Sequence, residues 1–267
     1  MSFHVSRICT PARLLLAGLG LTSLLHGVAY AQPTGGPPGN HYLVYQVRTP
    51  VPGGFPVLLR DQFTSPDFSS HVANPLEWFA NPVEKNGEAM LDSLLHYTWW
   101  RISTPEPFSQ RVVVKNQFGE FELDVQNPQY LLNPANKNTP VPGPPPPHGD
   151  HYKCYRAVGP FTPRPVTLRD QFGTFQGQVI APEWLCNPTE KVYQGVTNPI
   201  ERPELHYVCY RVQVSPTVPP TTITFLDQFR SGQAMVQNQT WLCVPSYKQI
   251  ITPAEKTSWG SVKSTYR

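Results

Sequence analysis

Four histidines are the first candidates for chemistry in this chain, because imidazole titrates near neutral pH and is the commonest metal ligand in proteins. Each stands directly before a tyrosine, and neighbouring His-Tyr pairs begin 55 residues apart. None has the HxH or HExxH companion of a metal site. Equivalent positions on separate copies of a repeat should be spread apart, so we interpret each histidine as a half-buried residue at a strand start, bonded to a neighbouring loop. They are His41, His96, His151 and His206.

Four polar residues that precede Gln-Phe have the chemistry of catalytic carboxylates. Three are aspartates, but the second copy has Asn116, which cannot act as a general acid or base. Aspartate and asparagine share one ability, a side-chain oxygen that caps backbone N–H groups in a turn. We therefore predict that all four residues lock turns. They are Asp61, Asn116, Asp170 and Asp227.

Two sets of aromatic residues recur with the repeat. The first set lies one position after each cysteine or its replacement, so on a strand its side chains point to the opposite face from the cysteines. If the outer face is open there, these rings form a surface that could stack on a sugar or on another protein; if a strand or loop covers them, they are core. These ligand-surface candidates are Tyr45, Trp100, Tyr155 and Tyr210. The second set lies two positions before each cysteine or its replacement, which favours core packing: Trp78, Tyr130, Trp184 and Trp241.

Four cysteines remain once the first 31 residues are set aside, and four cysteines allow three pairings. The corresponding positions are apolar in copy one (Val44 and Ala80) and in copy two (Trp99 and Leu132), so the two positions change together as partners in contact should. We predict disulfides Cys154–Cys186 and Cys209–Cys243. A crossed pairing, Cys154–Cys209 with Cys186–Cys243, explains the joint loss as well. The CxxC spacing of a zinc site is absent, and we expect no metal or cofactor.

The elements that position these residues are short strands. Each copy has a His-Tyr run, a run that ends in Gln-Phe and a run that ends near Asn-Pro. All are rich in Val, Tyr, Phe, Trp and Thr and bounded by Pro, Gly, Asn or Asp, which is typical of strands. We predict an all-β protein of two tandem β-sandwich domains, each built from two copies. A single four-bladed propeller is the rival, and it needs similar joints between all neighbouring copies.

A proline-rich segment between copies two and three sets the predicted domain boundaries. Domain one spans residues 40–134, with repeats 40–94 and 95–134, and domain two spans residues 150–248, with repeats 150–204 and 205–248. Residues 32–39 and 135–149 are then linkers, and residues 249–267 are a C-terminal tail.

The N-terminus has the pattern of a secretory signal peptide. A basic start precedes the apolar run from Leu14 to Leu25, and Ala29-Tyr30-Ala31 is a small-x-small cleavage site, so we predict cleavage after Ala31. Removal of residues 1–31 takes away two arginines and lowers the net charge from +3 to +1. A nearly neutral chain gives no electrostatic reason to expect nucleic-acid binding. No segment of the mature chain is long and apolar enough to predict a membrane span.

Copy three, which reads HYKCYR, then DQF, then WLCNPTEK, resembles a repeat found in uncharacterised secreted bacterial proteins, carried singly or in tandem. The resemblance is close over residues 150–193 and 205–248 and weaker over residues 40–134. It implies an exported, cysteine-clipped β module, and it provides no catalytic residues.

These observations predict a secreted, non-enzymatic protein that acts through its surface in adhesion or matrix contacts, with an unknown protein or glycan as partner. The absence of a nucleophile elbow, a phosphate loop and a dinucleotide fingerprint favours this interpretation. Glu77, Glu183 and Glu204 have no spacing that suits a general acid and base. The alternatives are a carbohydrate-binding module, which requires exposed rings at Tyr45, Trp100 or Tyr155, and a secreted hydrolase.

Overall fold

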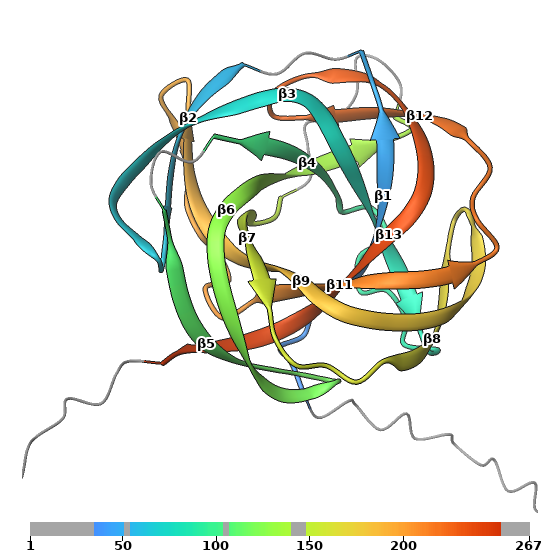
Figure 1. Ribbon diagram of the computed structural model, residues 1–267. Coiled ribbons are helices and arrows are strands. Elements are labelled where there is room, and N and C mark those ends of the chain that lie inside the picture. The colour runs from blue at the N-terminus through green and yellow to red at the C-terminus, as the bar shows by residue number, and fades with distance from the viewer. Residues whose placement is uncertain (1–34, 51–53, 104–106, 140–147, 252–267) are drawn as a thin grey trace, which may run out of the picture. The chain divides into compact units, whose positions relative to one another are not determined.

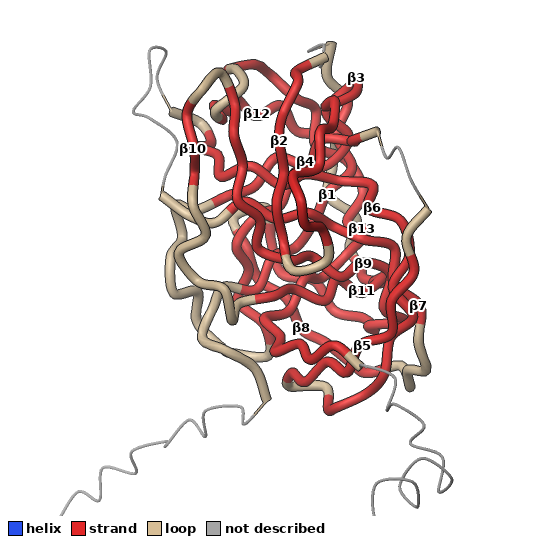
Figure 2. Tube along the Cα trace, turned by 90° about the vertical axis from the view of Figure 1, so that its left-hand side faces the viewer, coloured by secondary structure: helices blue, strands red, loops and turns tan. Residues whose placement is uncertain are grey.

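The computed structural model describes residues 35–50, 54–103, 107–139 and 148–251, all of which fall in one unit. These residues form strands joined by turns and loops (Figures 1 and 2), as the all-β prediction required. The described part of the chain has no helix long and apolar enough to cross a membrane. The predicted signal peptide, residues 1–31, lies outside the described residues, as does the tail from residue 252.

Each copy supplies two short strands and one long strand, and copy three adds a fourth strand of three residues. The His-Tyr pair opens the first strand, and the residue before Gln-Phe closes the second. The first two copies contain β1 (His41–Arg48), β2 (Phe55–Asp61), β3 (Thr64–Lys85), β4 (His96–Ile102), β5 (Ser109–Asn116) and β6 (Gly119–Lys137). The last two contain β7 (His151–Val158), β8 (Arg164–Asp170), β9 (Gly173–Tyr193), β10 (Val196–Asn198), β11 (His206–Ser215), β12 (Thr221–Asp227) and β13 (Ser231–Ile250).

The first and long strands of the four copies pair in a circular order. Each is antiparallel to the next along β1, β3, β4, β6, β7, β9, β11 and β13, and β13 also pairs with β1. Figure 1 shows these strands arranged around a common centre. The two halves of the chain therefore join in one 13-stranded sheet through β6–β7 and β1–β13. This corrects the predicted architecture: residues 40–134 and 150–248 are not two separate sandwiches.

The remaining short strands bind each copy to the copy two places along. The second strand of a copy pairs with its own long strand and also contacts the long strand of the opposite copy. Thus β2 pairs with β9, β8 with β3, β5 with β13, and β12 with β6. The pairings that join neighbouring copies are also alike: β3–β4, β6–β7, β9–β11 and β13–β1. The two-sandwich prediction assumed that the joint between copies two and three differs from the others. The proline-rich segment misled that prediction because it connects two adjacent antiparallel strands.

Two predicted boundaries also move. Strand β6 continues to Lys137, inside the expected linker 135–149, where Lys137 pairs with Phe225 of β12. Strand β13 continues to Ile250, beyond the expected domain end at residue 248, where Ile250 pairs with Val112 of β5. In both cases the extra residues make the pairing with the opposite copy.

The inner face of the sheet holds an aromatic core. One layer consists of the tyrosines of the four His-Tyr pairs, each edge-on to the next, with ring centroids 5.1 to 5.7 Å apart and interplanar angles of 74° to 82°. Such edge-to-face pairs add about 0.5–1.5 kcal/mol each beyond burial. The tyrosines are Tyr42, Tyr97, Tyr152 and Tyr207.

Two disulfides lie in the same core, and they join the pairs that the sequence analysis expected. Cys154 faces Cys186 across β7 and β9, and Cys209 faces Cys243 across β11 and β13. In copies one and two, Val44 faces Ala80 and Trp99 faces Leu132 at the equivalent positions. The bonds are consistent with an oxidising, extracytoplasmic location.

Copy one provides a design for removing one disulfide without a new kind of core. We expect the double substitution Cys209→Val with Cys243→Ala to fold, because Val44 and Ala80 fill the equivalent places. The free energy of unfolding should fall by about 3–4 kcal/mol, since the bond closes a loop of 34 residues. Thermal unfolding followed by circular dichroism would measure the loss. Unchanged stability, or a chain that no longer folds, would contradict this account of the core.

Candidate functional site

The four residues before Gln-Phe sit in tight turns. In each, a side-chain oxygen accepts a hydrogen bond from the backbone N–H two residues on, which is the contact that turn locking requires. The N···O distances are 3.1 Å at Asp61, 2.9 Å at Asn116, and 2.8 Å at both Asp170 and Asp227.

The outer atom of the same side chain is bound by the opposite copy. The hydroxyl of Tyr155 donates to Asp61 (2.8 Å), and the hydroxyl of Tyr45 donates to Asp170 (2.7 Å). The indole N–H of Trp100 donates to Asp227 over 2.7 Å. In copy two the direction is reversed, because the amide of Asn116 donates to the hydroxyl of Tyr210 over 2.8 Å. The exchange of Asp for Asn therefore preserves the bond.

These contacts correct the ligand-surface hypothesis. The four candidate rings are fully buried, with 0 % exposure, because the turn of the opposite copy covers the outer face of their strands. A ring with no exposed face cannot stack on a sugar, so the carbohydrate-binding alternative loses the feature on which it rested. The rings are Tyr45, Trp100, Tyr155 and Tyr210.

A lysine lies beside each turn, near the end of the long strand; Lys85 and Lys191 are buried, and Lys137 and Lys248 are half-buried. Lys137, Lys191 and Lys248 lie over the phenylalanine of an aspartate turn, with Nζ 5.0, 4.7 and 4.0 Å from the ring centroids. Burial lowers the pKa of each of these lysines to about 7, although the nearby aspartate raises it in part. Sequence reasoning overlooked these lysines, although they occupy a fixed position after Pro in all four copies.

The fourth lysine shows how the site adapts to a neutral turn. Lys85 lies 5.6 Å from the ring of Phe118, beside the turn that holds Asn116. There is no aspartate in that turn, and the ammonium of Lys85 pairs with Glu88 at 3.1 Å. The asparagine at position 116 of copy two is thus accompanied by Glu88 in copy one, so the buried ammonium of Lys85 keeps a negative partner. The other three lysines donate to the side-chain oxygens of Asn81, Asn133 and Asn187.

The four histidines lie at separate places in the sheet, and all are buried rather than half-buried as expected. Burial is the main cause that lowers the pKa of His41, His96 and His206 to about 3, and the lysine of the same copy lowers it further. The pKa of His151 falls well below its usual value for the same reasons. His96 and His206 place Nδ1 against a loop carbonyl, at 2.8 and 3.2 Å. Within the described ranges, no three potential ligands gather into a metal site.

The histidines should make the fold sensitive to acid. Because their pKa lies near 6.5 in the unfolded chain and about 3 in the fold, the unfolded state binds more protons between those values. The free energy of unfolding should therefore fall as the pH drops from 6.5 toward 3. His96→Asn, which can keep the bond to the Leu94 carbonyl, should make the slope shallower by up to about 1.4 kcal/mol per pH unit. Denaturant titrations between pH 4 and 7.5 would measure this.

The exposed His148 provides the matched control. His148→Asn should leave the pH dependence unchanged. If His96→Asn and the wild type gave parallel curves, the assignment of acid sensitivity to the buried histidines would be wrong.

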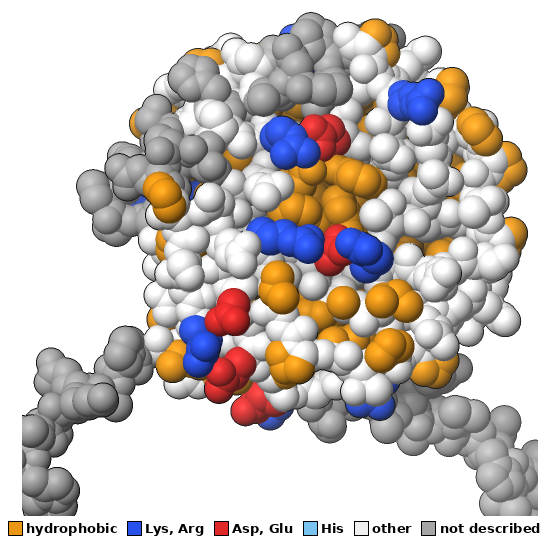
Figure 3. Space-filling model, in the orientation of Figure 1, with side chains coloured by type: hydrophobic (Ala, Val, Ile, Leu, Met, Phe, Trp, Pro, Cys, Tyr) orange, Lys and Arg blue, Asp and Glu red, His pale blue; other side chains and the backbone are white. Residues whose placement is uncertain are grey.

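The tryptophans before the cysteine positions close one end of the inner core. Glu183 binds Arg156, Arg211 and the indole N–H of Trp241, the last over 2.7 Å. Glu77 forms a two-bond pair with Arg101, at 2.7 and 2.9 Å, and accepts a bond from Tyr130. Figure 3 shows hydrophobic, basic and acidic side chains together in the middle of the face that it draws. Each carboxylate already has cationic partners, so the network covers the core.

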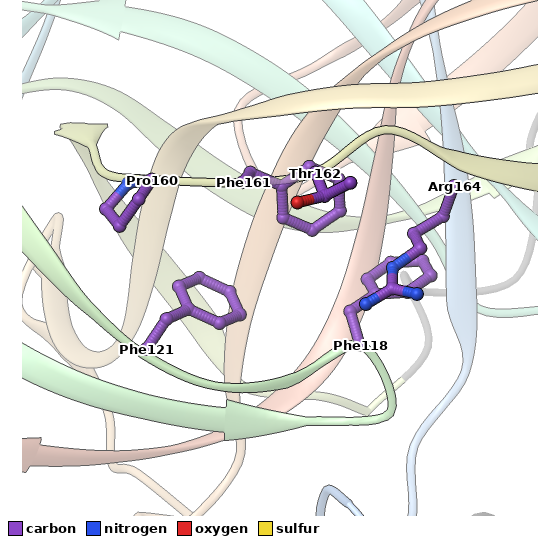
Figure 4. A pocket seen from close by; sticks show the side chains of 6 residues that line it. All are labelled: Phe118, Phe121, Pro160, Phe161, Thr162 and Arg164. Carbon is purple, nitrogen blue, oxygen red and sulfur yellow. The ribbon is translucent and has the colours of Figure 1, made fainter.

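A hollow of about 200 Å³ lies between the β5–β6 turn, which carries Phe118 of the repeated network, and the β7–β8 loop (Figure 4). We call it the phenylalanine pocket. Its lining residues are Phe118, Phe121, Pro160, Phe161, Thr162 and Arg164.

Local backbone geometry brings the two walls together. The β7–β8 loop begins at Gly159, where a Cβ would lie 2.5 Å from the Glu122 carbonyl oxygen of β6, so only glycine permits the approach. Phe161 then packs on the buried ring of Tyr210 (centroids 4.9 Å apart) and edge-on to Phe118 (5.7 Å). Phe121 stands 6.1 Å from Phe161. The pocket therefore has three aromatic walls that are each partly exposed.

Arg164 gives the pocket its charge. Its side chain is exposed, and among the described residues no carboxylate lies within ion-pair distance of it. Figure 4 shows its guanidinium directed toward the side of the pocket where Phe118 lies. The position six residues before the turn residue is Arg164 here but Phe55, Gln110 and Thr221 in the other copies. The positive charge is therefore no part of the repeat.

Comparison with known families places the chain by its repeat. A family model described as a repeat of unknown function (DUF7450) matches residues 96–245, more than half of the chain. The chain belongs to the DUF7450 repeat family. The match starts at the His-Tyr pair of copy two and ends within β13, so it covers three of the four copies. No curated protein and no solved structure matches. The DUF7450 match brings no activity, and any function must be argued from the surface of this chain.

Proposed function

We propose that this DUF7450 protein is an exported, non-enzymatic binding protein that acts in adhesion or matrix contacts, with the phenylalanine pocket as its binding site. One observation carries the proposal: three partly exposed phenylalanines surround a hollow whose rim bears an arginine with no carboxylate partner among the described residues. Recognition pockets usually combine apolar walls with a few placed polar groups, and this hollow combines phenylalanine rings with the guanidinium of Arg164.

Export is supported from two sides. The two disulfides suit an oxidising compartment. The sequence of residues 1–31, with its apolar run and the Ala29-Tyr30-Ala31 site, has the form of a cleaved signal peptide.

A non-enzymatic role is supported by how the reactive side chains are used. The residues with acid–base chemistry recur in equivalent places, and each is engaged by the fold. The turn aspartates cap backbone and bind the opposite copy, the lysines lie over aromatic rings, and the carboxylates of Glu77 and Glu183 pair with arginines. A catalytic constellation usually breaks such a repeat, because its members need different environments.

The pocket indicates the chemistry of its ligand. A volume of about 200 Å³ is below the usual 300–1,000 Å³ of small-molecule sites, so it suits one apolar side chain of a larger partner. An arginine beside it favours a carboxylate, which the guanidinium binds with two parallel hydrogen bonds. We therefore propose that the pocket takes an apolar side chain that lies next to an acidic group.

N-acetylphenylalanine is a probe of this proposal, and N-acetylphenylalanine amide is its uncharged control. Titrations of the mature chain followed by NMR should show the acid shifting signals of the pocket phenylalanines and binding about tenfold more tightly than the amide, since a charged hydrogen bond contributes about 1.5–3 kcal/mol. Arg164→Gln should remove that preference. Arg48→Gln, which changes an exposed arginine outside the pocket, should leave it intact.

Equal binding of the acid and the amide by the wild type would refute the role of Arg164. Absence of any shift at the pocket phenylalanines would refute the pocket as a binding site.

A further inference from the structure

The loop between β3 and β4 holds two leucines in solvent. Leu91 is 69 % exposed and Leu94 is 73 % exposed. The loop is nevertheless fixed by capping bonds. Asn40 accepts from the backbone N–H groups of Leu91 and Asp92, at 2.8 and 3.0 Å, and Asp92 accepts from that of Leu94 at 2.8 Å. We call residues 88–94 the leucine loop.

Copy three contains the same loop with different side chains. There Asp150 takes the place of Asn40 and accepts from the N–H groups of Glu201 and Arg202, at 2.6 and 2.9 Å. Glu201 therefore corresponds to Leu91. The carbonyl oxygens of Leu94 and Glu204 each lie beside the Nδ1 of the histidine that follows, so these two residues correspond as well.

This internal comparison separates folding from function. The same backbone carries two exposed leucines in one copy and two exposed glutamates in the other. The fold therefore has no need of apolar side chains there, and exposed leucines cost solubility without helping the core. A contact with another molecule accounts for them.

The leucine loop has the chemistry that the phenylalanine pocket selects. It presents apolar side chains at Leu91 and Leu94 beside the exposed carboxylate of Asp92, and the pocket presents aromatic walls beside the guanidinium of Arg164. The two sites share no residue, so each molecule carries both halves of a contact.

We propose that the leucine loop of one molecule occupies the phenylalanine pocket of a second copy, with Asp92 beside Arg164. The proposal rests on the function proposed for the pocket and names the partner as this same chain. A contact of one loop with one pocket is far smaller than a standard interface, so a single contact is weak. Many copies held together on a surface or in a matrix would strengthen it by avidity.

Sedimentation equilibrium of the mature chain over a range that reaches millimolar concentration tests the proposal. The wild type should associate reversibly. The double substitution Leu91→Glu with Leu94→Glu, which copies the residues of copy three, should raise the dissociation constant at least about tenfold. Val196→Glu, an equally drastic change at a side chain that is 56 % exposed in β10, should leave association unchanged.

A double-mutant cycle tests the charged pair. Asp92→Asn keeps the capping oxygen and removes the charge, and Arg164→Gln removes its partner. Each alone should weaken association by about three- to tenfold, and the double variant should be no weaker than either single one. Additive losses would overturn the pairing of Asp92 with Arg164.

A mixture of two variants distinguishes the proposed contact from nonspecific association. The leucine-loop double variant keeps an intact pocket, and Arg164→Gln keeps an intact loop, so a mixture of the two should associate more strongly than the leucine-loop variant alone. A wild type that stays monomeric up to millimolar concentration would overturn this inference. If its pocket still bound N-acetylphenylalanine, the proposed function would stand; if it did not, both would fail.

Discussion

The fold depends on a hydrogen bond that each turn makes with the copy two places along. A turn aspartate or asparagine caps its own backbone with one atom and meets an aromatic donor or acceptor of the opposite copy with the other. The bond is buried at Asp61, Asn116 and Asp227 and partly buried at Asp170. A buried polar group left without its partner would cost about 1–3 kcal/mol. The bond therefore fixes which long strand the second strand of each copy, with its turn, covers. The burial of the outer aromatic rings follows from that placement.

Charge in the outer core follows the same constraint. A lysine beside each turn is buried or half-buried, and a negative charge in its surroundings offsets part of the cost. The charge of a turn aspartate raises the pKa of three of these lysines, which donate to asparagine side chains, and Lys85, beside the neutral Asn116, pairs with Glu88. The histidines lie next to these lysines and stay neutral. The histidines, lysines and turn residues form one structural arrangement that is repeated four times. We therefore propose that function lies where the copies differ, as they do at Arg164 and at Leu91 and Leu94.

Local features were predictable from the sequence, and long-range ones were not. Comparison of the copies identified the strands, the capping role at Asp61 and its equivalents, and the disulfide partners. Each of these features depends on residues that lie within a single copy. The architecture depends on which long strand each hairpin joins, and backbone pairing carries little sequence signal. Tyr45 was placed on the outer face, but its burial depends on the turn at Asp170, 125 residues away. The phenylalanine pocket joins Phe118 to Phe161 from different copies, and only Arg164, a charge where the other copies have none, could have indicated it.

The four copies fold as one unit because opposite copies complete each other. A protease site placed within residues 140–147 tests it, since cleavage there separates copies one and two from copies three and four. The two fragments should stay together after cleavage and show the near-ultraviolet circular dichroism of the intact chain, and each fragment isolated in denaturant should fail to refold alone. Fragments that separate and each unfold cooperatively would contradict the claim and restore the picture of two independent domains.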